Sequence, residues 1–377
     1  MTGALVNHLS GAPRARGPRL RWPAPDSSRG TARLGPVPSP IPNSISEGVE
    51  QVLHLVPRSS TRSCPTTAPE AKPLPPYTIG AMTNDLPFSS VEDLQERLRE
   101  QAYLADRALA TSIYLAVSLD KPLLLEGEAG VGKTEVAKAL ATALDRELIR
   151  LQCYEGIDAS QALYEWDYSR QLIAVRAMQA DELADPTSRV SDLFGEEFLV
   201  ERPLLAAIRA GDRAVLLVDE LDRADDEFGA FLLEVLSEFA VTIPELGRIA
   251  SLHPPAVVIT SNRTRELHDA LKRRCLYHWI DHPTLEREVE IIGVRAPEVS
   301  PALAQQVAGA VARLRSMEVA KRPGVAEAID WAHALAFLGV DGLDGEAAAA
   351  TLGAVLKDHD DLEMARAAIG AVVGSES

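Results

Sequence analysis

The sequence predicts an α/β fold in which parallel strands form a central sheet, followed by a small helical domain. Three observations predict this class. An apolar run, a glycine-rich loop and an amphipathic helix follow one another in LLLEGEAGVGKTEVAKAL, residues 123–140. Two later apolar runs, which begin at Ala214 and Val257, end in polar side chains, as buried parallel strands with a ligand at their carboxyl edge do. After His282 the apolar residues recur at helical spacing.

The chain of 377 residues is long enough for two or three domains, and its 46% hydrophobic and 25% charged residues are ordinary for a globular protein. No apolar run approaches the roughly 18 residues of a membrane helix, and the N-terminus lacks the apolar core of a secretory signal. The cysteines, Cys64, Cys153 and Cys275, are too far apart for a metal motif and indicate no disulfide framework. We therefore expect a cytoplasmic protein with reduced thiols.

Residues 1–81 differ in composition from the rest, because they hold 14 of the 25 prolines and show no apolar periodicity. We expect this segment to be disordered. It is a flexible tail, a targeting peptide, or a stretch upstream of a natural start at Met82, where globular composition begins. Residues 82–284 are then expected to form the α/β core, and residues 285–377 the helical domain.

The charge is unevenly distributed along the chain. Residues 1–81 contain nine Lys and Arg against four Asp and Glu, a net charge of about +5. Because the whole chain has a net charge of −17, the remaining residues carry about −22. An acidic body repels phosphate backbones, or it simply keeps the protein soluble. Both interpretations disfavour nucleic acid as the main partner.

A helical stretch is predicted from the N-cap residue Ser90 onward. Its apolar residues recur at helical spacing and form the expected buried stripe: Leu94, Leu98, Leu109, Ile113 and Val117.

The next motif satisfies G-x-x-x-x-G-K-[ST] with Gly127, Gly132, Lys133 and Thr134. Glycines allow backbone angles and close approach that a side chain would block. Successive amide groups and the start of the following helix then bind phosphate oxygens, while Lys133 reaches the β- and γ-phosphates and Thr134 coordinates Mg²⁺. The alternative is a glycine-rich turn without a ligand. The flanking strand and helix favour a nucleotide site.

Two strand ends supply groups that phosphoryl transfer requires. Asp219 is placed to hold Mg²⁺ through its water shell, and Glu220 to orient or deprotonate the attacking water. Asn262, at the end of the next apolar run, offers an amide to the γ-phosphate and the water. Each has a simpler alternative, since an acidic strand end caps turns and an asparagine forms them.

Arg273 and Arg274 precede a further strand-like run and have no acidic neighbour in sequence. An arginine donated to the γ-phosphate of a neighbouring subunit explains them. The alternative is a solvated basic helix end.

These motifs occur in the order and with the gaps of an AAA+ ATPase, which the chain resembles from about Val91 to Leu338. The run PLLAAIRAGDRAVLLVDELDRADDEFGAFLLEVLSEFAVTI resembles the MoxR group of that superfamily. The runs ALYEWDYSRQLI, RRCLYHWIDHP and PGVAEAIDWA resemble its CoxD-like branch, which is associated with maturation of carbon monoxide dehydrogenase. The resemblance implies an αβα core with a five-stranded, mostly parallel sheet and a C-terminal helical lid.

The resemblance also implies roles for single residues. Lys133 and Thr134 correspond to the Walker A lysine and hydroxyl, Asp219 and Glu220 to the Walker B pair, and Asn262 to the first sensor. The residues expected to hold the nucleotide are Gly127, Glu128, Ala129, Gly130, Val131, Gly132, Lys133, Thr134, Asp219 and Arg322. Thr134 and Asp219 are the expected metal ligands.

Three basic residues complete the implied site. Arg274 corresponds to the arginine finger, with Arg273 as the alternative. Arg322 is the expected second sensor. Lys321 is the alternative, because this chain lacks the SPRA-like sequence motif of other members.

The segment DASQALYEWDY replaces the LPSD-type segment of the MoxR group. Tyr164, Trp166 and Tyr168 alternate with polar residues, which predicts a hairpin. Its aromatic side chains either grip a partner or pack locally.

Two histidines, His278 and His282, have the spacing of helical metal ligands. Their surroundings read as a strand, which places them roughly 13 Å apart and excludes a shared zinc ion. Beyond them, Leu303, Val307, Val311 and Leu314 form one helical stripe, and Val325, Ile329, Ala332 and Ala336 form another.

The resemblance implies an Mg²⁺-dependent ATPase that works as a homo-oligomeric ring, expected to be a hexamer. It implies a chaperone-like motor that matures a client such as a molybdenum hydroxylase, together with a partner carrying a von Willebrand factor A domain. The alternatives are a nucleic-acid motor, which requires a basic pore or a DNA-binding module, and a nucleotide-gated assembly factor with little turnover.

Overall fold

The computed structural model describes residues 88–178 and 193–374. Every described residue belongs to one unit of the chain, residues 75–377. The tail predicted for residues 1–81 lies outside the described residues.

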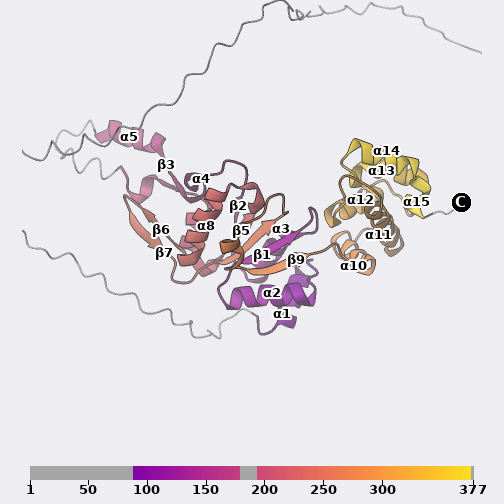
Figure 1. Cartoon of the computed structure of the whole chain (residues 1–377), viewed down its shortest axis with the longest axis horizontal. Coiled ribbons are helices and arrows are strands. Elements are labelled where there is room, and N and C mark those ends of the chain that lie inside the picture. Colours follow the sequence, from indigo (N-terminus) through magenta and orange to yellow (C-terminus); the bar gives the residue numbers. More distant parts are fainter. Residues whose placement is uncertain (1–87, 179–192, 375–377) are drawn as a thin grey trace, which may run out of the picture. The chain divides into compact units, whose positions relative to one another are not determined.

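A five-stranded sheet lies at the centre of the core (Figure 1). All its neighbouring strands pair in parallel. In spatial order it consists of β2 (Glu147–Gln152), β5 (Ala214–Asp219), β8 (Ala256–Ser261), β1 (Leu123–Gly127) and β9 (Leu276–Ile280). The predicted α/β class and the five parallel strands are therefore confirmed.

Alternate residues of the strands face two separate helical layers. Leu123 and Val215 belong to a cluster with α1 (Val91–Glu100), α2 (Arg107–Ser118) and α3 (Lys133–Ala143). Leu124 and Leu216 belong to a cluster with α4 (Ala159–Leu163), α7 (Pro203–Ala210) and α8 (Asp226–Glu238). This alternation follows from the two-residue repeat of a strand and explains why every residue of β1 and β5 is buried.

The predicted stripe after Ser90 is divided between two helices. Ser90 caps α1, because its side chain accepts a hydrogen bond from the backbone N–H of Asp93 at 3.1 Å. The chain then breaks at Ala102, which has a positive φ of 56°. The stripe residues of both helices are buried, except Val117, which is half-buried.

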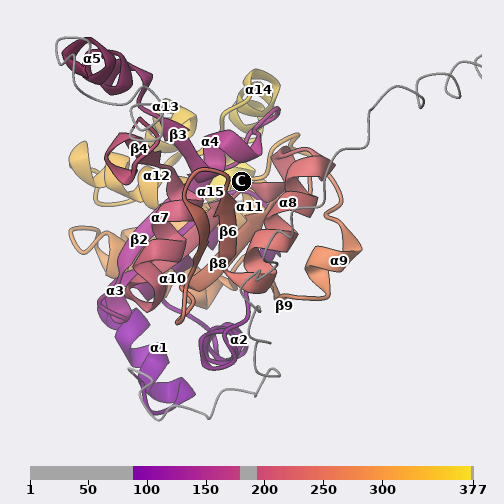
Figure 2. The same cartoon turned by 90° about the vertical axis from the view of Figure 1, so that its left-hand side faces the viewer.

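Two small two-stranded sheets extend the core. β6 (Ala240–Ile243) pairs with β7 (Gly247–Ala250), and β3 (Tyr164–Trp166) pairs with β4 (Leu199–Glu201). Figure 2 shows β3 and β4 beside α4. Short 3-10 turns include η1 (Glu196–Phe198) before β4 and η2 (Gly211–Arg213) before β5.

The aromatic run of the predicted hairpin is only partly in a strand. Trp166 is buried, and its ring lies edge-on to that of Phe194 with centroids 5.2 Å apart. Tyr168 instead begins α5 (Tyr168–Met178), because the side chain of Asp167 accepts a hydrogen bond from the N–H of Arg170 and starts the helix. The hairpin prediction was therefore wrong for Tyr168.

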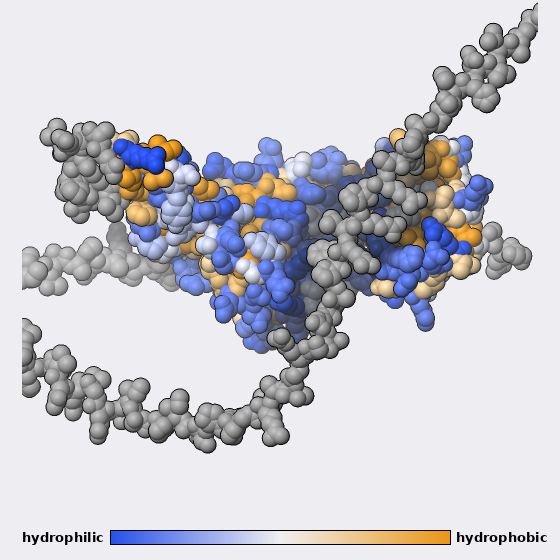
Figure 3. Space-filling view, turned by 90° about the horizontal axis from the view of Figure 1, so that it is seen from above, coloured by the Kyte–Doolittle hydropathy of each residue, from blue (hydrophilic) through white to orange (hydrophobic). Residues whose placement is uncertain are grey.

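Helix α5 exposes three large apolar side chains. Tyr168, Leu172 and Ile173 are each more than half exposed, and hydrophobic surface gathers at this end of the core in Figure 3. The helix therefore leaves apolar side chains in contact with solvent, which is unusual for a soluble surface.

The residues after β9 form a helical unit with its own apolar core. It consists of α10 (Leu285–Arg295), α11 (Pro301–Ser316), α12 (Val325–Phe337), α13 (Gly345–Val355), α14 (His359–Ala367) and α15 (Ile369–Val373). Trp331 is fully buried at its centre and donates to the hydroxyl of Thr351 at 2.7 Å. The predicted α11 stripe is buried throughout, whereas Ile329 and Ala336 of the α12 stripe are half-buried.

Candidate active site

The glycine loop connects β1 to α3 and requires its glycines. Gly130 and Gly132 have φ values of 77° and 95°, in the left-handed region that side chains disfavour. A Cβ on Gly127 would lie 2.4 Å from the carbonyl oxygen of Ile280 in β9. The loop can therefore keep this path between two strands and a helix only with glycine at these positions.

Lys133 is the first residue of α3 and lies inside the loop, with 7% of its surface exposed. Its Nζ donates to the carbonyl oxygens of Gly127 at 2.8 Å and Glu128 at 2.6 Å. Burial lowers the pKa of Lys133, although the neighbouring carboxylates, led by Asp222, oppose this shift. The ammonium group is thus enclosed by the loop, where the amides of a helix N-terminus also converge.

The glycine loop and the acidic strand end meet at Thr134 and Asp219. Asp219 ends β5 and is 2% exposed. Its Oδ1 accepts hydrogen bonds from Thr134 Oγ1 at 3.0 Å and from Thr260 Oγ1 at 2.6 Å. A hydroxyl and a carboxylate at this separation are hard oxygen donors of the kind that Mg²⁺ prefers, so the site fits the ion.

Glu220 follows Asp219 and adopts a left-handed conformation with φ 56° at the start of η3 (Leu221–Arg223). Its backbone N–H donates to Thr260 Oγ1 at 2.9 Å. Its carboxylate accepts from Gln152 Nε2 at 3.0 Å and pairs with Arg223 at 3.1 Å. Side chains from β2 and β8 therefore hold Glu220 beside the strand edge.

Asn262 lies directly after β8, the strand between β5 and β1. It is half-buried, and within the described residues its side-chain amide has no hydrogen-bond partner. Because the carboxyl ends of parallel strands meet at one edge, Asn262 shares that edge with Asp219 and Gly127.

Three side chains of the site were not predicted from the sequence. Gln152 and Thr260 hold the acidic pair as described above. Arg150, two residues before Gln152 in β2, donates from Nε and Nη2 to Asp219 Oδ2 at 3.0 and 2.5 Å. The alternation R-x-Q in a strand next to an acidic strand end was the available signal, since it places both side chains on one face.

Arg273 and Arg274 lie away from the glycine loop of their own chain. They follow α9 (Asp269–Lys272), and both are exposed. Arg274 Nη1 donates to the carbonyl oxygen of Leu233 in α8 at 3.2 Å. Neither guanidinium contacts the loop, Asp219 or Glu220.

The helical unit contacts the glycine loop directly. The N–H groups of Val325 and Ala326, at the start of α12, donate to the carbonyl oxygen of Gly130 at 2.9 and 3.3 Å. Arg322 forms an ion pair with Glu128 at 3.7 Å, while its side chain stays 56% exposed. Lys321 is exposed, and its backbone N–H donates to Asp361 Oδ2 at 3.1 Å. Of the two second-sensor candidates, Arg322 is thus the one beside the loop.

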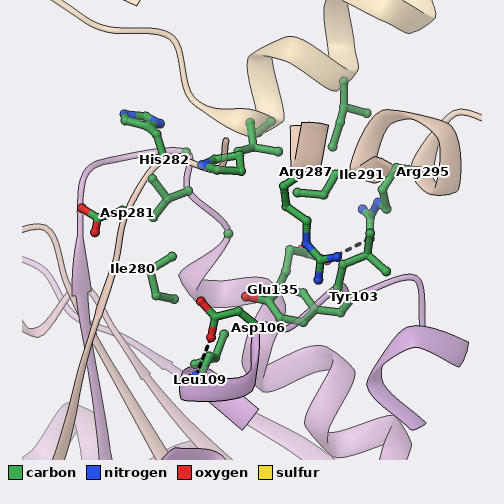
Figure 4. Close-up of a pocket in the computed structure, with 18 of the residues that line it drawn as sticks. Tyr103, Asp106, Leu109, Glu135, Ile280, Asp281, His282, Arg287, Ile291 and Arg295 are labelled. Atoms are coloured by element: carbon green, nitrogen blue, oxygen red, sulfur yellow. Dashed lines mark hydrogen bonds and ion pairs between the residues drawn. The ribbon is translucent and has the colours of Figure 1, made fainter. Parts of the chain in front are cut away.

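A cavity of about 550 Å³ adjoins the loop. Gly130 and Gly132 line one side, and Figure 4 shows Tyr103 and Ile280 of the core opposite Ile291 of α10. Its mixture of apolar walls and a phosphate-type loop at one end suits a nucleoside with its phosphates.

The two histidines near the cavity have different partners. His278, in β9, lies 3.4 Å from Ser112 Oγ, and His282 lies 3.1 Å from Glu128 Oε2. His278 is in a strand, as predicted, and each ring is engaged by a different side chain.

Residues 122–275 match the family model described as AAA domain (dynein-related subfamily). This segment is an AAA+ domain. The match runs from the residue before β1 to the residue before β9 and so contains the glycine loop, the acidic pair, Asn262 and both arginines.

The curated relatives are distant, and each match covers less than half of this chain. The chain is 26% identical over 185 residues to the gas vesicle ATPase GvpN2 of Halobacterium salinarum, covering 47% of this chain and 52% of that protein. It is 26% identical over 177 residues to the chaperone protein ClpB of Mycoplasma genitalium, covering 45% and 22%. An uncharacterized protein of Staphylococcus saprophyticus is 24% identical over 172 residues, covering 44% and 57%. The chain therefore spans about half or less of these relatives' lengths.

Among solved structures, a Thermotoga maritima RuvB mutant matches with a TM-score of 0.42 and 17% identity, covering 76% of this chain and 85% of that one.

Within residues 88–178 and 193–374, no helix combines the length and the apolar character needed to cross a membrane.

Proposed function

We propose that the chain is an Mg²⁺-dependent ATPase that converts ATP and water to ADP and phosphate. The observation that carries the proposal is the hydrogen bond of 3.0 Å between Thr134 and Asp219. It joins two motifs separated by 85 residues, one suited to phosphate and the other to a divalent ion. A nucleotide in the adjoining cavity would then have its phosphates beside both.

Each polar residue at the strand edge has a part in this reaction. Lys133 and the loop amides bind the phosphates, and Thr134 with Asp219 holds the metal, which neutralises charge on the phosphates when bound. Glu220 takes a proton from the attacking water or orients it, and Asn262 positions the same water. Thr260 holds the backbone of Glu220 at the edge of the sheet by accepting its N–H. Gln152 orients the Glu220 carboxylate by donating to it.

We propose further that the chain works as a ring, expected to be a hexamer. Arg274 is exposed, and its guanidinium contacts Leu233 rather than the glycine loop of its own chain, which suits action on a neighbour's γ-phosphate. Heterologous contacts between identical subunits close into rings when the rotation allows.

The work done by the ring is proposed to be chaperone-like remodelling or maturation of another protein complex in the cytoplasm. The similarity to a protein named chaperone ClpB and to a gas vesicle ATPase supports a protein client. The exposed apolar side chains of α5 offer a surface for it. A molybdenum hydroxylase as client, and a partner with a von Willebrand factor A domain, rest on the CoxD-like resemblance alone.

The deciding experiment compares ATP turnover and nucleotide binding in the wild type and in Glu220→Gln. The amide keeps the shape of the side chain but cannot accept the proton, so we expect turnover to fall by about a hundredfold while binding is retained. No ATP turnover by the wild type, with or without partner proteins, would leave the assembly factor as the better description. Tight, salt-sensitive DNA binding that stimulates turnover would favour the nucleic-acid motor.

A further inference from the structure

The oxygens of Asp219 are already occupied by protein donors. Oδ1 accepts from the hydroxyls of Thr134 and Thr260. Oδ2 accepts two N–H groups from Arg150, at 3.0 and 2.5 Å. A guanidinium therefore lies against the carboxylate that is expected to face the divalent ion.

Arg150 is also linked to Glu220 through Gln152. Arg150 Nη2 donates to Gln152 Oε1, and Gln152 Nε2 donates to Glu220 Oε2 at 3.0 Å. Because a guanidinium only donates and a carboxylate only accepts, the amide of Gln152 has one orientation that satisfies both. Asp219, Arg150, Gln152 and Glu220 thus form one continuous hydrogen-bonded chain.

The position of Arg150 allows it to leave Asp219 without disturbing the core. β2 is an edge strand of the sheet, and the Arg150 side chain is 49% exposed, whereas Asp219 is 2% exposed. The guanidinium can move into water, while the carboxylate stays fixed by two hydroxyls. Arginine stays charged at every physiological pH, so the competing cation cannot be lost by deprotonation.

We propose that Arg150 is a built-in cation that competes with Mg²⁺ for Asp219 and, while it does so, orients Gln152 against Glu220. The proposal rests on the proposed function and adds the regulation of its metal site. When Arg150 holds Asp219, the site has low metal affinity and Glu220 is fixed by Gln152. When Arg150 withdraws, Asp219 is released for the metal, while Gln152 Nε2 can still donate to Glu220.

The test is the Mg²⁺ dependence of nucleotide binding, which requires no turnover. Fluorescent N-methylanthraniloyl-ADP is titrated against the full chain at increasing Mg²⁺, for the wild type, Arg150→Ala and Arg150→Met. Both variants remove the charge, and the methionine keeps an apolar stem. Because a nearby positive charge repels a divalent ion, we expect the Mg²⁺ concentration for half-maximal binding to fall by about tenfold in both.

Two control variants separate this role from a general effect of charge. Arg223→Ala removes a cation that pairs with Glu220 rather than Asp219, so its Mg²⁺ midpoint should stay within about twofold of the wild type. Arg150→Lys keeps the charge and should remain within about threefold of the wild type. An equal tenfold fall in Arg223→Ala would overturn the proposal, since any cation near the acidic pair would then suffice.

A third arm is binding in excess EDTA, which tests whether Arg150 binds phosphate instead. Unchanged metal-free affinity in Arg150→Ala supports competition with the ion, whereas a loss of tenfold or more would make Arg150 a phosphate ligand and overturn it. An unchanged or raised Mg²⁺ midpoint in both neutral variants overturns this inference alone. A wild type that binds no nucleotide at any Mg²⁺ concentration overturns the proposed function together with it.

Discussion

Gly324 of the helical unit and Gly130 of the glycine loop touch backbone to backbone. A Cβ on Gly324 would lie 2.6 Å from the Cα of Gly130, and one on Gly130 would lie 2.9 Å from the Cα of Gly324. The close approach lets the N–H groups at the start of α12 reach the Gly130 carbonyl oxygen. The loop that is proposed to bind phosphates is therefore also the docking point of the lid.

Gly324→Ala should disturb that docking. The added methyl group meets backbone atoms that cannot yield, a type of overpacking that costs about 1–3 kcal/mol. We expect nucleotide affinity to fall by about tenfold, measured by calorimetric titration. Gly353→Ala is the matched control, because a Cβ there meets nothing within 4 Å and glycine in a helix is unfavourable. Equal affinities in the two variants would show that the contact does not matter for binding.

Gln152→Ala should separate binding from turnover. Gln152 touches Glu220 and Arg150 but none of the loop residues, so nucleotide affinity should stay within about threefold. Without the amide, Glu220 loses one of the groups that fix its direction, and we expect kcat to fall by about tenfold. Steady-state kinetics with Gln161→Ala, on the exposed surface, as control would check this. An unchanged kcat would mean that Thr260 and Arg223 suffice.

Arg274→Ala should leave nucleotide binding intact and reduce turnover by about a thousandfold under conditions where the chain oligomerises. The loss of its hydrogen bond to Leu233 is a surface effect and should change stability little. Arg273→Ala is the natural control, because Arg273 is equally exposed and adjacent. If Arg273→Ala has the larger effect, the finger is the other arginine of the pair.

The thiols of the AAA+ domain should be inert in the native protein. Burial raises the pKa of Cys153 to about 12, with Asp219 as the next contributor, and burial likewise raises the pKa of Cys275 to about 12. At pH 8, far below these values, both remain neutral thiols and poor nucleophiles. In a Cys64→Ser variant, we expect no reaction with a disulfide reagent until denaturant is added, after which two thiols react. Rapid labelling without denaturant would contradict this.

The sequence was sufficient where a motif and its surroundings agreed. Lys133, Thr134, Asp219 and Asn262 all follow strands whose apolar runs are unambiguous, and parallel strands bring their carboxyl ends to one edge. Their placement could therefore be predicted without coordinates.

Other features depended on long-range partners that a single sequence does not reveal. Arg150 and Gln152 lie in a strand that reads as an ordinary half-polar run, and only its pairing with β5 brings them to Asp219 and Glu220. Tyr168 was misplaced because the two-residue alternation continues past Trp166 by chance, while Asp167 starts a helix there. The contact of Gly324 with Gly130 depends on tertiary docking and leaves no local signal.

Asp361 of α14 gives the C-terminal helices a wider role. It is 2% exposed, and its carboxylate accepts the N–H groups of Ala320 and Lys321 at 2.8 and 3.1 Å, just ahead of Arg322 and Gly324. Shortening the chain before α14 would remove that anchor from the segment that touches the nucleotide loop. A truncation near the C-terminus would thus weaken nucleotide binding, although none of the removed residues contacts the glycine loop.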